Sequence, residues 1–447
     1  MKQIIYSIFL CLQFMPVQLR AQVYTLEACK DSALIDNIDI KNKALDIKAS
    51  EQVKKAAFTN YFPQVEASAF AYKFSDALIE MDVPAMDLPV YDGNPQNLPI
   101  ATQFAHFPGM PMSMIEKGNI AMATATQPLY AGRQIANGNK LANIGIEVNE
   151  IQLKSIRKEI LLETERQYWQ IISLYEKKKT LESYIALLDT LHQNVSISVK
   201  AGMITRNDLL KVQLQQNELQ MNLSKLTNGI ELAQMAFCQY TGIEYQPDIS
   251  FNDQIIIDKN PEEYFINHHE ALRNREEYLL LQKSTEAEQY KTKLQRGEFL
   301  PQAAVGVGAM HFDIMDDSGS NVAMAFGTIS IPISGWWEGK HKMKERKLRE
   351  TQNTNMVHNT NEQLLLQMQQ GYNNLDEAFT QVTLSETSVE QARENLRLNQ
   401  NNYEAGMVNV SDMLEAQAQL QQSLDAHTEA QTQYRIAKMH YLRITGR

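Results

Sequence analysis

Two short stretches decide how the chain is organised: Lys200-Ala201-Gly202-Met203-Ile204 and Glu404-Ala405-Gly406-Met407-Val408. Each follows a long run of helical composition and precedes a second such run. A glycine between two helices supplies the left-handed backbone conformation that ends the first of them. Each stretch is therefore predicted to be the tip of a helical hairpin.

An internal repeat relates the two tips, because residues 201–242 align without a gap on residues 405–446. Both segments begin with Ala-Gly-Met and end with Thr-Gly. Further upstream the offset changes from 204 to 238 residues, so the first copy carries 34 extra residues. Self-similarity of this kind predicts two structural copies of one unit in the chain.

Each unit is predicted to contain a helix, two strands, a very long helix, a tip and a return helix, in that order. In the first repeat, residues 22–242, we expect a helix at 31–58, strands at about 63–130 with a long loop at 83–118, a helix at 133–200, a tip at 201–205 and a return helix at 206–242. The second repeat, residues 243–447, is expected to contain a linker at 243–260, a helix at 261–298, strands at 301–334, a helix at 337–404, a tip at 405–409 and a return helix at 410–446. The loop is placed where prolines are frequent, between Val83 and Pro111.

The very long helices are predicted from two proline-free runs, residues 133–200 and 337–404. At about 1.5 Å per residue each would extend roughly 100 Å, which is too long for a compact domain. Apolar residues recur at heptad spacing in these runs and in the return helices, so coiled-coil packing is expected. Such positions include Met368, Leu375, Val382, Val389, Leu396 and Tyr403.

The four predicted strands have about the length of tilted transmembrane strands. Small and larger residues alternate in them, and Asp316-Asp317-Ser318-Gly319 has the composition of a turn that closes the second hairpin. Four strands cannot close a barrel, and open sheet edges are not tolerated in lipid. A membrane location would therefore require several chains to pool their strands. A soluble sheet of two hairpins remains an alternative at this point.

The N-terminal residues 1–21 read as a secretory signal peptide, because Lys2 precedes a short apolar run and Leu19-Arg20-Ala21 suits cleavage. Neither Cys11 nor Cys29 follows the small residues that lipidation would need. Cys29 and Cys238 are expected to be two buried thiols, although a disulfide between them remains open.

Composition and motifs exclude several other functions. The net charge of −11 argues against a nucleic-acid partner. His268, His269 and His311 lack the spacing of a metal site. No motif for a cofactor or for catalysis stands out, so we expect neither a cofactor nor an enzyme.

Nearly the whole mature chain resembles the TolC family of outer-membrane efflux proteins. The resemblance lies in the order of several motifs: TLEACKDSAL at 25–34, NREEYLLLQ at 274–282, FPQ and LPQ before the strands, QPLYAGR and IPISGWW after them, and the tips VKAGMITRNDLLKVQ and NYEAGMVNVSDMLEAQ. It implies a mixed α and β membrane protein that forms a homotrimer. The family's strands make one twelve-stranded β-barrel in the outer membrane, and its helices continue as an α-barrel in the periplasm.

The resemblance also implies partners and site residues. The tips would meet a periplasmic adaptor protein and an inner-membrane pump of the RND or ABC type. In the family, an acidic pair just after the second tip narrows the tunnel, and Asp412 and Glu415 occupy those positions, with Tyr403 ahead of the glycine. Val408 replaces an arginine that helps to close the family's aperture. The adaptor-docking residues would be Ala201, Gly202, Met203, Ala405, Gly406 and Met407.

Each assignment has a plainer alternative. Asp412 and its counterpart Asp208 stand where a helix begins, so capping alone could explain both. Tyr130, Trp336 and Trp337 are expected to mark the membrane interface, against outer-membrane lipid, or else to pack against helices.

The predicted function is that of an exit duct in the outer membrane of a Gram-negative bacterium, extending into the periplasm and serving a tripartite efflux or type I secretion system. The alternatives are a structural coiled-coil protein of the envelope without a pore and, less favoured, a diffusion porin.

Overall fold

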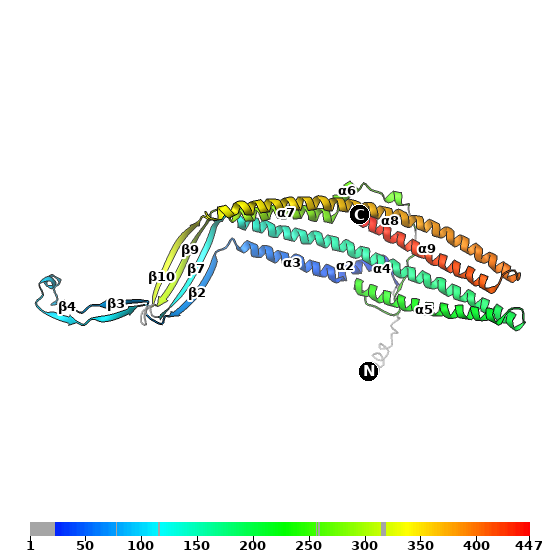
Figure 1. Cartoon of the computed structure of the whole chain (residues 1–447), viewed down its shortest axis with the longest axis horizontal. Helices are drawn as coiled ribbons and strands as arrows, with labels where there is room; N and C mark the ends of the chain where they lie inside the picture. Colours follow the sequence, from blue (N-terminus) through cyan, green and yellow to red (C-terminus); the bar gives the residue numbers. More distant parts are fainter. Residues whose placement is uncertain (1–22, 77, 115–116, 256, 258–259, 314–318) are drawn as a thin grey trace, which may run out of the picture. The chain divides into compact units, whose positions relative to one another are not determined.

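The computed structural model describes residues 23–76, 78–114, 117–255, 257, 260–313 and 319–447. It contains both long helices and a β-sheet, as the sequence predicts (Figure 1). Two compact units can be separated. Of the described residues, the helical unit comprises 23–49, 146–285 and 352–447, and the sheet unit comprises 50–145 and 286–351. The predicted signal peptide, residues 1–21, and the turn at 316–318 lie outside the described residues.

The sheet unit is built on four antiparallel strands. These are β2 (Gln64–Lys73), β7 (Lys117–Ala131), β9 (Gln302–Asp313) and β10 (Ser320–Ser330). Their order is β10-β9-β7-β2, so one hairpin comes from each sequence repeat. Within this sheet, β2 and β10 are the two edge strands, and each pairs on one side only. Each repeat therefore contributes two strands to this sheet, as predicted.

The predicted long loop at 83–118 is wrong, because most of it is a β-ribbon inserted between β2 and β7. Strand β3 (Ile79–Val83) pairs with β6 (Met110–Met114), and β4 (Met86–Pro89) pairs with β5 (Phe104–Phe107). A 3₁₀ helix, η2 (Pro95–Ile100), closes the far end. Proline is tolerated because both strands of a two-stranded ribbon are edges, where a residue without an N–H group disrupts no central ladder.

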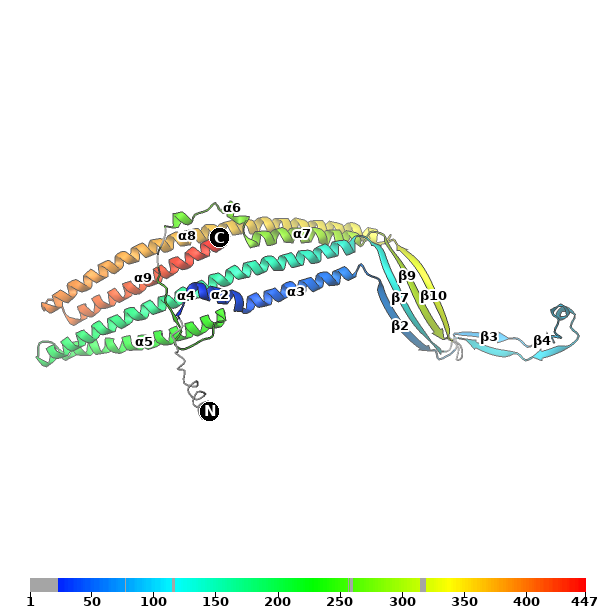
Figure 2. The ribbon, with the colours of Figure 1, turned by 180° about the vertical axis from the view of Figure 1, so that it is seen from behind.

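Two helical hairpins form most of the helical unit. The first consists of α4 (Gln134–Lys200) and α5 (Arg206–Thr241), and the second of α8 (Gly335–Glu404) and α9 (Val410–Ile444). The two members of each hairpin run side by side (Figures 1 and 2). All four helices begin and end within three residues of their predicted limits. Among the described residues, no helix combines the length and the apolar character that a membrane span requires.

The helices that precede the strands are broken, contrary to prediction. The first is divided at Asn37 into α2 (Leu26–Asp36) and α3 (Ile38–Thr59). The single helix expected at 261–298 is replaced by η3 (Pro261–Tyr264), α6 (His268–Leu272) and α7 (Glu276–Gly297). Asn260 and Asn267 explain these interruptions, because their side chains accept hydrogen bonds from backbone N–H groups and so start new helical turns. Short strands β1 (Val23–Tyr24) and β8 (Ser250–Phe251) pair in parallel.

The predicted heptad positions form the core between α8 and α9. Met368, Leu375 and Val382 are buried against Tyr434 and other residues of α9. A second core contains both described cysteines, Cys29 and Cys238, as buried free thiols, and burial raises the pKa of Cys29 to about 12. The expectation of buried thiols is confirmed.

A buried arginine ties the start of α7 to α8. Arg275 is only 2% exposed. It donates two hydrogen bonds to Glu277, at 3.1 and 3.0 Å, and one to Gln367 of α8 at 3.1 Å. Although burial of Glu277 favours its neutral form, the hydrogen bonds from Arg275 lower its pKa below the ordinary value. Arg275 belongs to the NREEYLLLQ run, which thus has a structural role.

We predict that Glu277→Gln destabilises the helical unit by about 3 kcal/mol, because a buried guanidinium loses its countercharge. Glu394→Gln is the matched control, since its ion pair with Arg397 is exposed to solvent and should contribute little to stability. Thermal unfolding of the purified protein measures both. A carboxylate with a lowered pKa stabilises at neutral pH and loses this contribution as the pH falls through that pKa. Acidification should therefore narrow the difference in melting temperature between the wild type and Glu277→Gln. Equal melting temperatures of Glu277→Gln and Glu394→Gln at neutral pH would contradict the assignment.

Candidate functional site

The two tips have the same backbone geometry. Gly202 and Gly406 have φ angles of 73° and 71°. At the first tip, Gly202 N–H donates to Val199 O at 3.0 Å and Met203 N–H donates to Ser198 O at 2.9 Å. Equivalent bonds at the second tip join Gly406 to Tyr403 and Met407 to Asn402. This is the Schellman motif, which satisfies carbonyl groups at the end of a helix. The predicted positive φ angles are confirmed.

A capping box follows each tip. Asn409 begins α9, and its backbone N–H donates to Asp412 Oδ2 at 3.1 Å while its side-chain oxygen accepts from Ser411 and Asp412 N–H. At the first tip, Thr205 donates to Asp208 from both its backbone and its hydroxyl group. Capping therefore accounts for both aspartates as structural residues. It leaves the second Asp412 oxygen, Oδ1, without a hydrogen bond to the cap.

The residue three positions after each aspartate makes the tips electrostatically different. Lys211, in the first hairpin, lies 3.7 Å from Asp208 and partly neutralises it. Lys211 also donates to Ser411 Oγ at 2.8 Å, which joins the two hairpins. Glu415 occupies the equivalent position in the second hairpin, where it is exposed and accepts from Gln419. Only the second tip therefore carries two carboxylates on consecutive turns of one helix.

Tyr403 belongs to the apolar cluster that holds the tips together. It packs, half-buried, with Val410 and Met413 of α9 and with residues of the first hairpin. Burial raises its pKa, and the nearby carboxylate of Asp208 raises it further. The structure thus brings Tyr403 close to the start of both return helices. Of the other predicted tip residues, Met203 and Met407 are 79% and 70% exposed, so an apolar side chain projects from each tip.

The predicted interfacial aromatic residues all belong to the sheet unit and are exposed in the single chain. Tyr130 lies near the end of β7, next to an irregularity in the β7–β9 pairing. Trp336 and Trp337 begin α8, and the indole N–H of Trp336 donates to Phe299 O at 3.0 Å. Trp337 is 76% exposed. Their exposure suits contact with lipid or with another chain, and the interfacial role stays a prediction.

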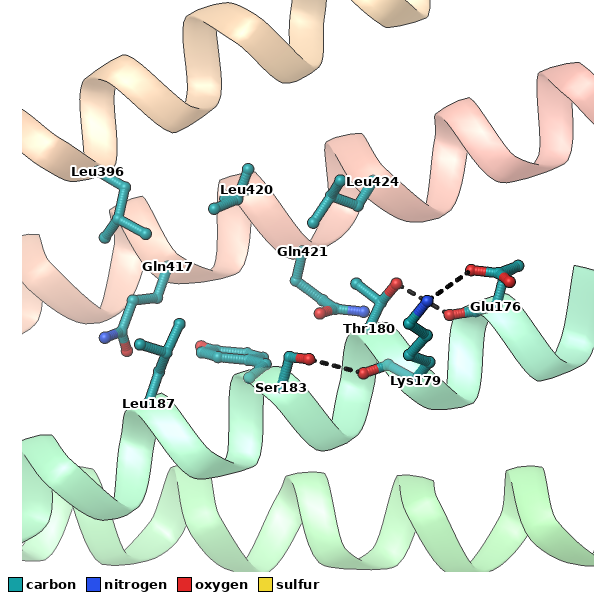
Figure 3. A pocket seen from close by; sticks show the side chains of 11 residues that line it. Glu176, Lys179, Thr180, Ser183, Leu187, Leu396, Gln417, Leu420, Gln421 and Leu424 are labelled. Atoms are coloured by element: carbon teal, nitrogen blue, oxygen red, sulfur yellow. Dashed lines mark hydrogen bonds and ion pairs between the residues drawn. The ribbon is translucent and has the colours of Figure 1, made fainter.

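A cavity of about 190 Å³ lies between α4 and the second hairpin (Figure 3). Tyr184 and Gln417 line it, and both are about 95% buried, yet neither the tyrosine hydroxyl nor the glutamine oxygen has a hydrogen-bond partner among the described residues. Because ligand pockets usually exceed about 300 Å³, this cavity suits water rather than a substrate.

The described residues contain no group of three or more histidine, cysteine or acidic side chains that could hold a metal ion. His268, considered above, lies 3.2 Å from the Tyr441 hydroxyl and packs beside its ring.

Comparison with known proteins agrees with this architecture. Residues 267–447 match the family model described as outer membrane efflux protein. Three solved structures each cover 94% of this chain. They are the outer membrane protein VceC from Vibrio cholerae (12% identity, 96% of its chain covered, TM-score 0.69), the Campylobacter jejuni CmeC outer membrane channel (14%, 85%, 0.72) and the open state of the Neisseria gonorrhoeae MtrE outer membrane channel (13%, 88%, 0.72). A comparison with curated protein sequences finds no match.

The family match falls on the second repeat, and the shared fold extends over the first. Together they confirm the resemblance to the TolC family that the duplicated motifs indicate. Residues 267–447 thus match the outer membrane efflux protein family, and nearly the whole chain has the fold of solved outer-membrane channels.

Proposed function

We propose that three copies of the chain form a passive exit duct for a tripartite efflux or type I secretion system. The strands would make one twelve-stranded barrel in the outer membrane, and the helical hairpins would form a tunnel in the periplasm. A periplasmic adaptor and an inner-membrane pump of the RND or ABC type would deliver the cargo and supply the energy. The family match over residues 267–447 and the shared fold support this proposal, and the trimer and its partners are the parts that need testing.

The observation that carries the proposal is the open four-stranded sheet. Among the residues that the structure describes, strands β2 and β10 each have one unpaired edge. A sheet in lipid must satisfy every backbone N–H and C=O group, so it must close on itself. Small single-chain barrels already need about eight strands, twice the number in this sheet. Pairing β10 of one chain with β2 of the next would close the ring through identical contacts between chains.

The two faces of the sheet differ as a barrel wall requires. Pairing register places Ala67, Ala123, Ala309 and Ala323 side by side in the middle of one face. The next row on one side contains Val65, Ala125, Val307 and Ala325, so two successive rows are wholly apolar, whereas the row on the other side contains His311 and Asn321, which contact each other. The opposite face carries the polar side chains of Glu66, Ser68, Thr124 and Thr126 together with methionines, glycines and large apolar residues such as Phe326. An ionised carboxylate such as Glu66 is costly to place against lipid. We assign the alanine and valine face to lipid and the Glu66 face to the lumen.

In the helical unit, we assign the aperture to Asp412 and Glu415. Three chains would bring six carboxylates toward one axis, and a ring of such groups attracts cations. Capping fixes the backbone at Asp412 without consuming its charge. The first tip lacks this property, because Lys211 lies beside Asp208.

Replacing both carboxylates tests the aperture. In the double variant Asp412→Asn/Glu415→Gln, the asparagine oxygen can still accept the capping hydrogen bond while both charges are lost. The preference for cations over anions, measured from reversal potentials of single channels in planar bilayers, should fall severalfold. Asp208→Asn is the control at the first tip and should leave the preference unchanged. Equal selectivity of the double variant and the wild type would refute the assignment.

Substitution of Gly406 tests whether the tip geometry serves docking. A non-glycine residue with this φ angle costs about 1–2 kcal/mol, although asparagine adopts it more readily. Space is available, since a Cβ atom at Gly406 would have no neighbour within 4 Å. We expect Gly406→Val to abolish dye efflux in cells while trimers persist on gels, and Gly406→Asn to retain most efflux. Full efflux by the valine variant would contradict a docking role.

A further inference from the structure

The start of α8 carries a basic run that the duct itself does not require. Residues 338–350 read Glu-Gly-Lys-His-Lys-Met-Lys-Glu-Arg-Lys-Leu-Arg-Glu and contain six lysine or arginine residues and three glutamates. This local excess of positive charge occurs in a chain whose net charge is −11. The run directly follows Trp336 and Trp337, and it belongs to the sheet unit.

Only half of these basic side chains are neutralised by carboxylates. Three of them form ion pairs, which are Lys342–Glu338 at 2.9 Å, Arg349–Glu345 at 2.9 Å and Arg346–Glu288 at 2.6 Å. The other three are Lys340, Lys344 and Lys347, which we call the lysine face. They are exposed and form no ion pair with any residue that the structure describes.

The lysine face is one side of α8. Its members are spaced by four and three residues, so they lie on the same side of the helix as Trp337, which is 76% exposed. The opposite side packs on α7 and the residue that follows it. There Arg346 donates to Glu288, and a Cβ atom at Gly339 would lie 3.0 Å from Phe299. The lysine face is therefore turned away from α7.

The first repeat shows that a long helix after a strand does not need this charge. At the offset of 204 residues, the lysine face corresponds to Ala136, Lys140 and Asn143 of α4. Only Lys140 keeps the charge, and its ammonium group lies 5.6 Å from the centre of the Tyr290 ring. Asn143 instead accepts a hydrogen bond from Lys54 at 2.7 Å. The unpaired charges are thus specific to the second repeat.

The lysine face lies close to the exposed tryptophans. At about 1.5 Å per residue, Lys340 lies roughly 5 Å and Lys347 roughly 15 Å from Trp337 along the helix. Side chains of a helix lean toward its N-terminus, and the aliphatic part of lysine carries the ammonium group further in that direction. If Trp336 and Trp337 mark the membrane interface, the ammonium groups lie next to the lipid headgroups.

A second copy of the chain would not neutralise the lysine face. The proposed pairing of β10 with β2 of the next chain would bring α8 beside α3, because α3 immediately precedes β2. The last residues of α3 include Lys54 and Lys55, and no acidic residue follows Glu51 in this helix. The neighbouring copy would therefore add positive charge, which favours an anionic ligand at this place.

We propose that the lysine face binds the phosphate groups of anionic phospholipids in the leaflet of the outer membrane that faces the periplasm. The proposal rests on the proposed membrane barrel. Basic residues beside a membrane segment attract anionic headgroups over about one Debye length. Trp337, on the same side of the helix, supplies the aromatic side chain that is typical of the interface.

Brominated lipids test the proposal with the full-length protein. The chain has three tryptophans, and Trp169 is only 4% exposed in the helical unit, so Trp336 and Trp337 report on nearby lipid. The protein is reconstituted into vesicles of phosphatidylglycerol and phosphatidylcholine in equal amounts. Bromine, which quenches tryptophan fluorescence at short range, is placed on the acyl chains of one lipid or the other. Quenching should be severalfold stronger when phosphatidylglycerol carries the bromine.

Salt and substitution should both remove this preference. Raising the salt from about 0.1 M to about 1 M shortens the Debye length from about 10 Å to about 3 Å, so the two lipids should then quench alike. They should also quench alike in the triple variant Lys340→Gln/Lys344→Gln/Lys347→Gln, in which glutamine preserves helix propensity. The control changes three exposed lysines of the helical unit to glutamine and should behave as the wild type does; these are Lys179, Lys200 and Lys225.

The outcomes separate this proposal from the proposed duct. Equal quenching by the two lipids in the wild type would overturn the lipid site while leaving the barrel in place. If isolated peptidoglycan then retained the wild type but not the triple variant, the lysine face would belong to the cell wall instead. Absence of quenching by either lipid would contradict the membrane location itself, and with it both proposals.

Discussion

The unpaired edges of β2 and β10 are the constraint on which the rest of the structure depends. Each repeat contributes one hairpin, and two hairpins make a sheet that cannot close within one chain. In lipid, each unsatisfied backbone group would cost several kcal/mol. If the sheet lies in lipid, as we propose, the fold therefore requires association of chains. The apolar middle of one sheet face and the exposed aromatic residues beside the strands follow the same requirement.

Duplication also explains why the helical unit has two tips with one backbone geometry and different charges. The glycine turn and the capping box are common to both because each ends one helix and begins another. Lys211 and Glu415 occupy the same place in the repeat but act oppositely. Lysine neutralises Asp208 and contacts Ser411 of the other hairpin, whereas Glu415 adds a second exposed charge. One tip is thereby suited to joining the hairpins and the other to forming an acidic ring.

Much of this architecture could be predicted from local sequence. Heptad spacing and the absence of proline located the long helices, and Gly202 and Gly406 located the tips, because the underlying rules involve neighbouring residues. The sequence predicts a loop where the ribbon at 79–114 lies, because its prolines are incompatible with a central strand. Both strands of a two-stranded ribbon are edge strands, however, and edge strands accept proline. Local caps at Asn260 and Asn267 break the segment 261–298 into separate helices. The helical composition of the whole segment predicts one continuous helix, so the sequence does not reveal these breaks. Contacts between distant elements, such as Lys211 with Ser411 and the Tyr184–Gln417 cavity, have no local signal.

Disulfide trapping between β2 and β10 tests the central claim most directly. Ala69→Cys in β2 would be combined in turn with cysteine at Asn321, Ala323 or Ala325 of β10, which share its face, and oxidised in native membranes. Closure by three chains predicts linked species of two and three chains and none larger. Cysteines at Ala123 and Ala309, which pair directly within one chain, should give only monomers. Absence of linked chains for every β2–β10 combination, or a ladder extending beyond three, would contradict the account.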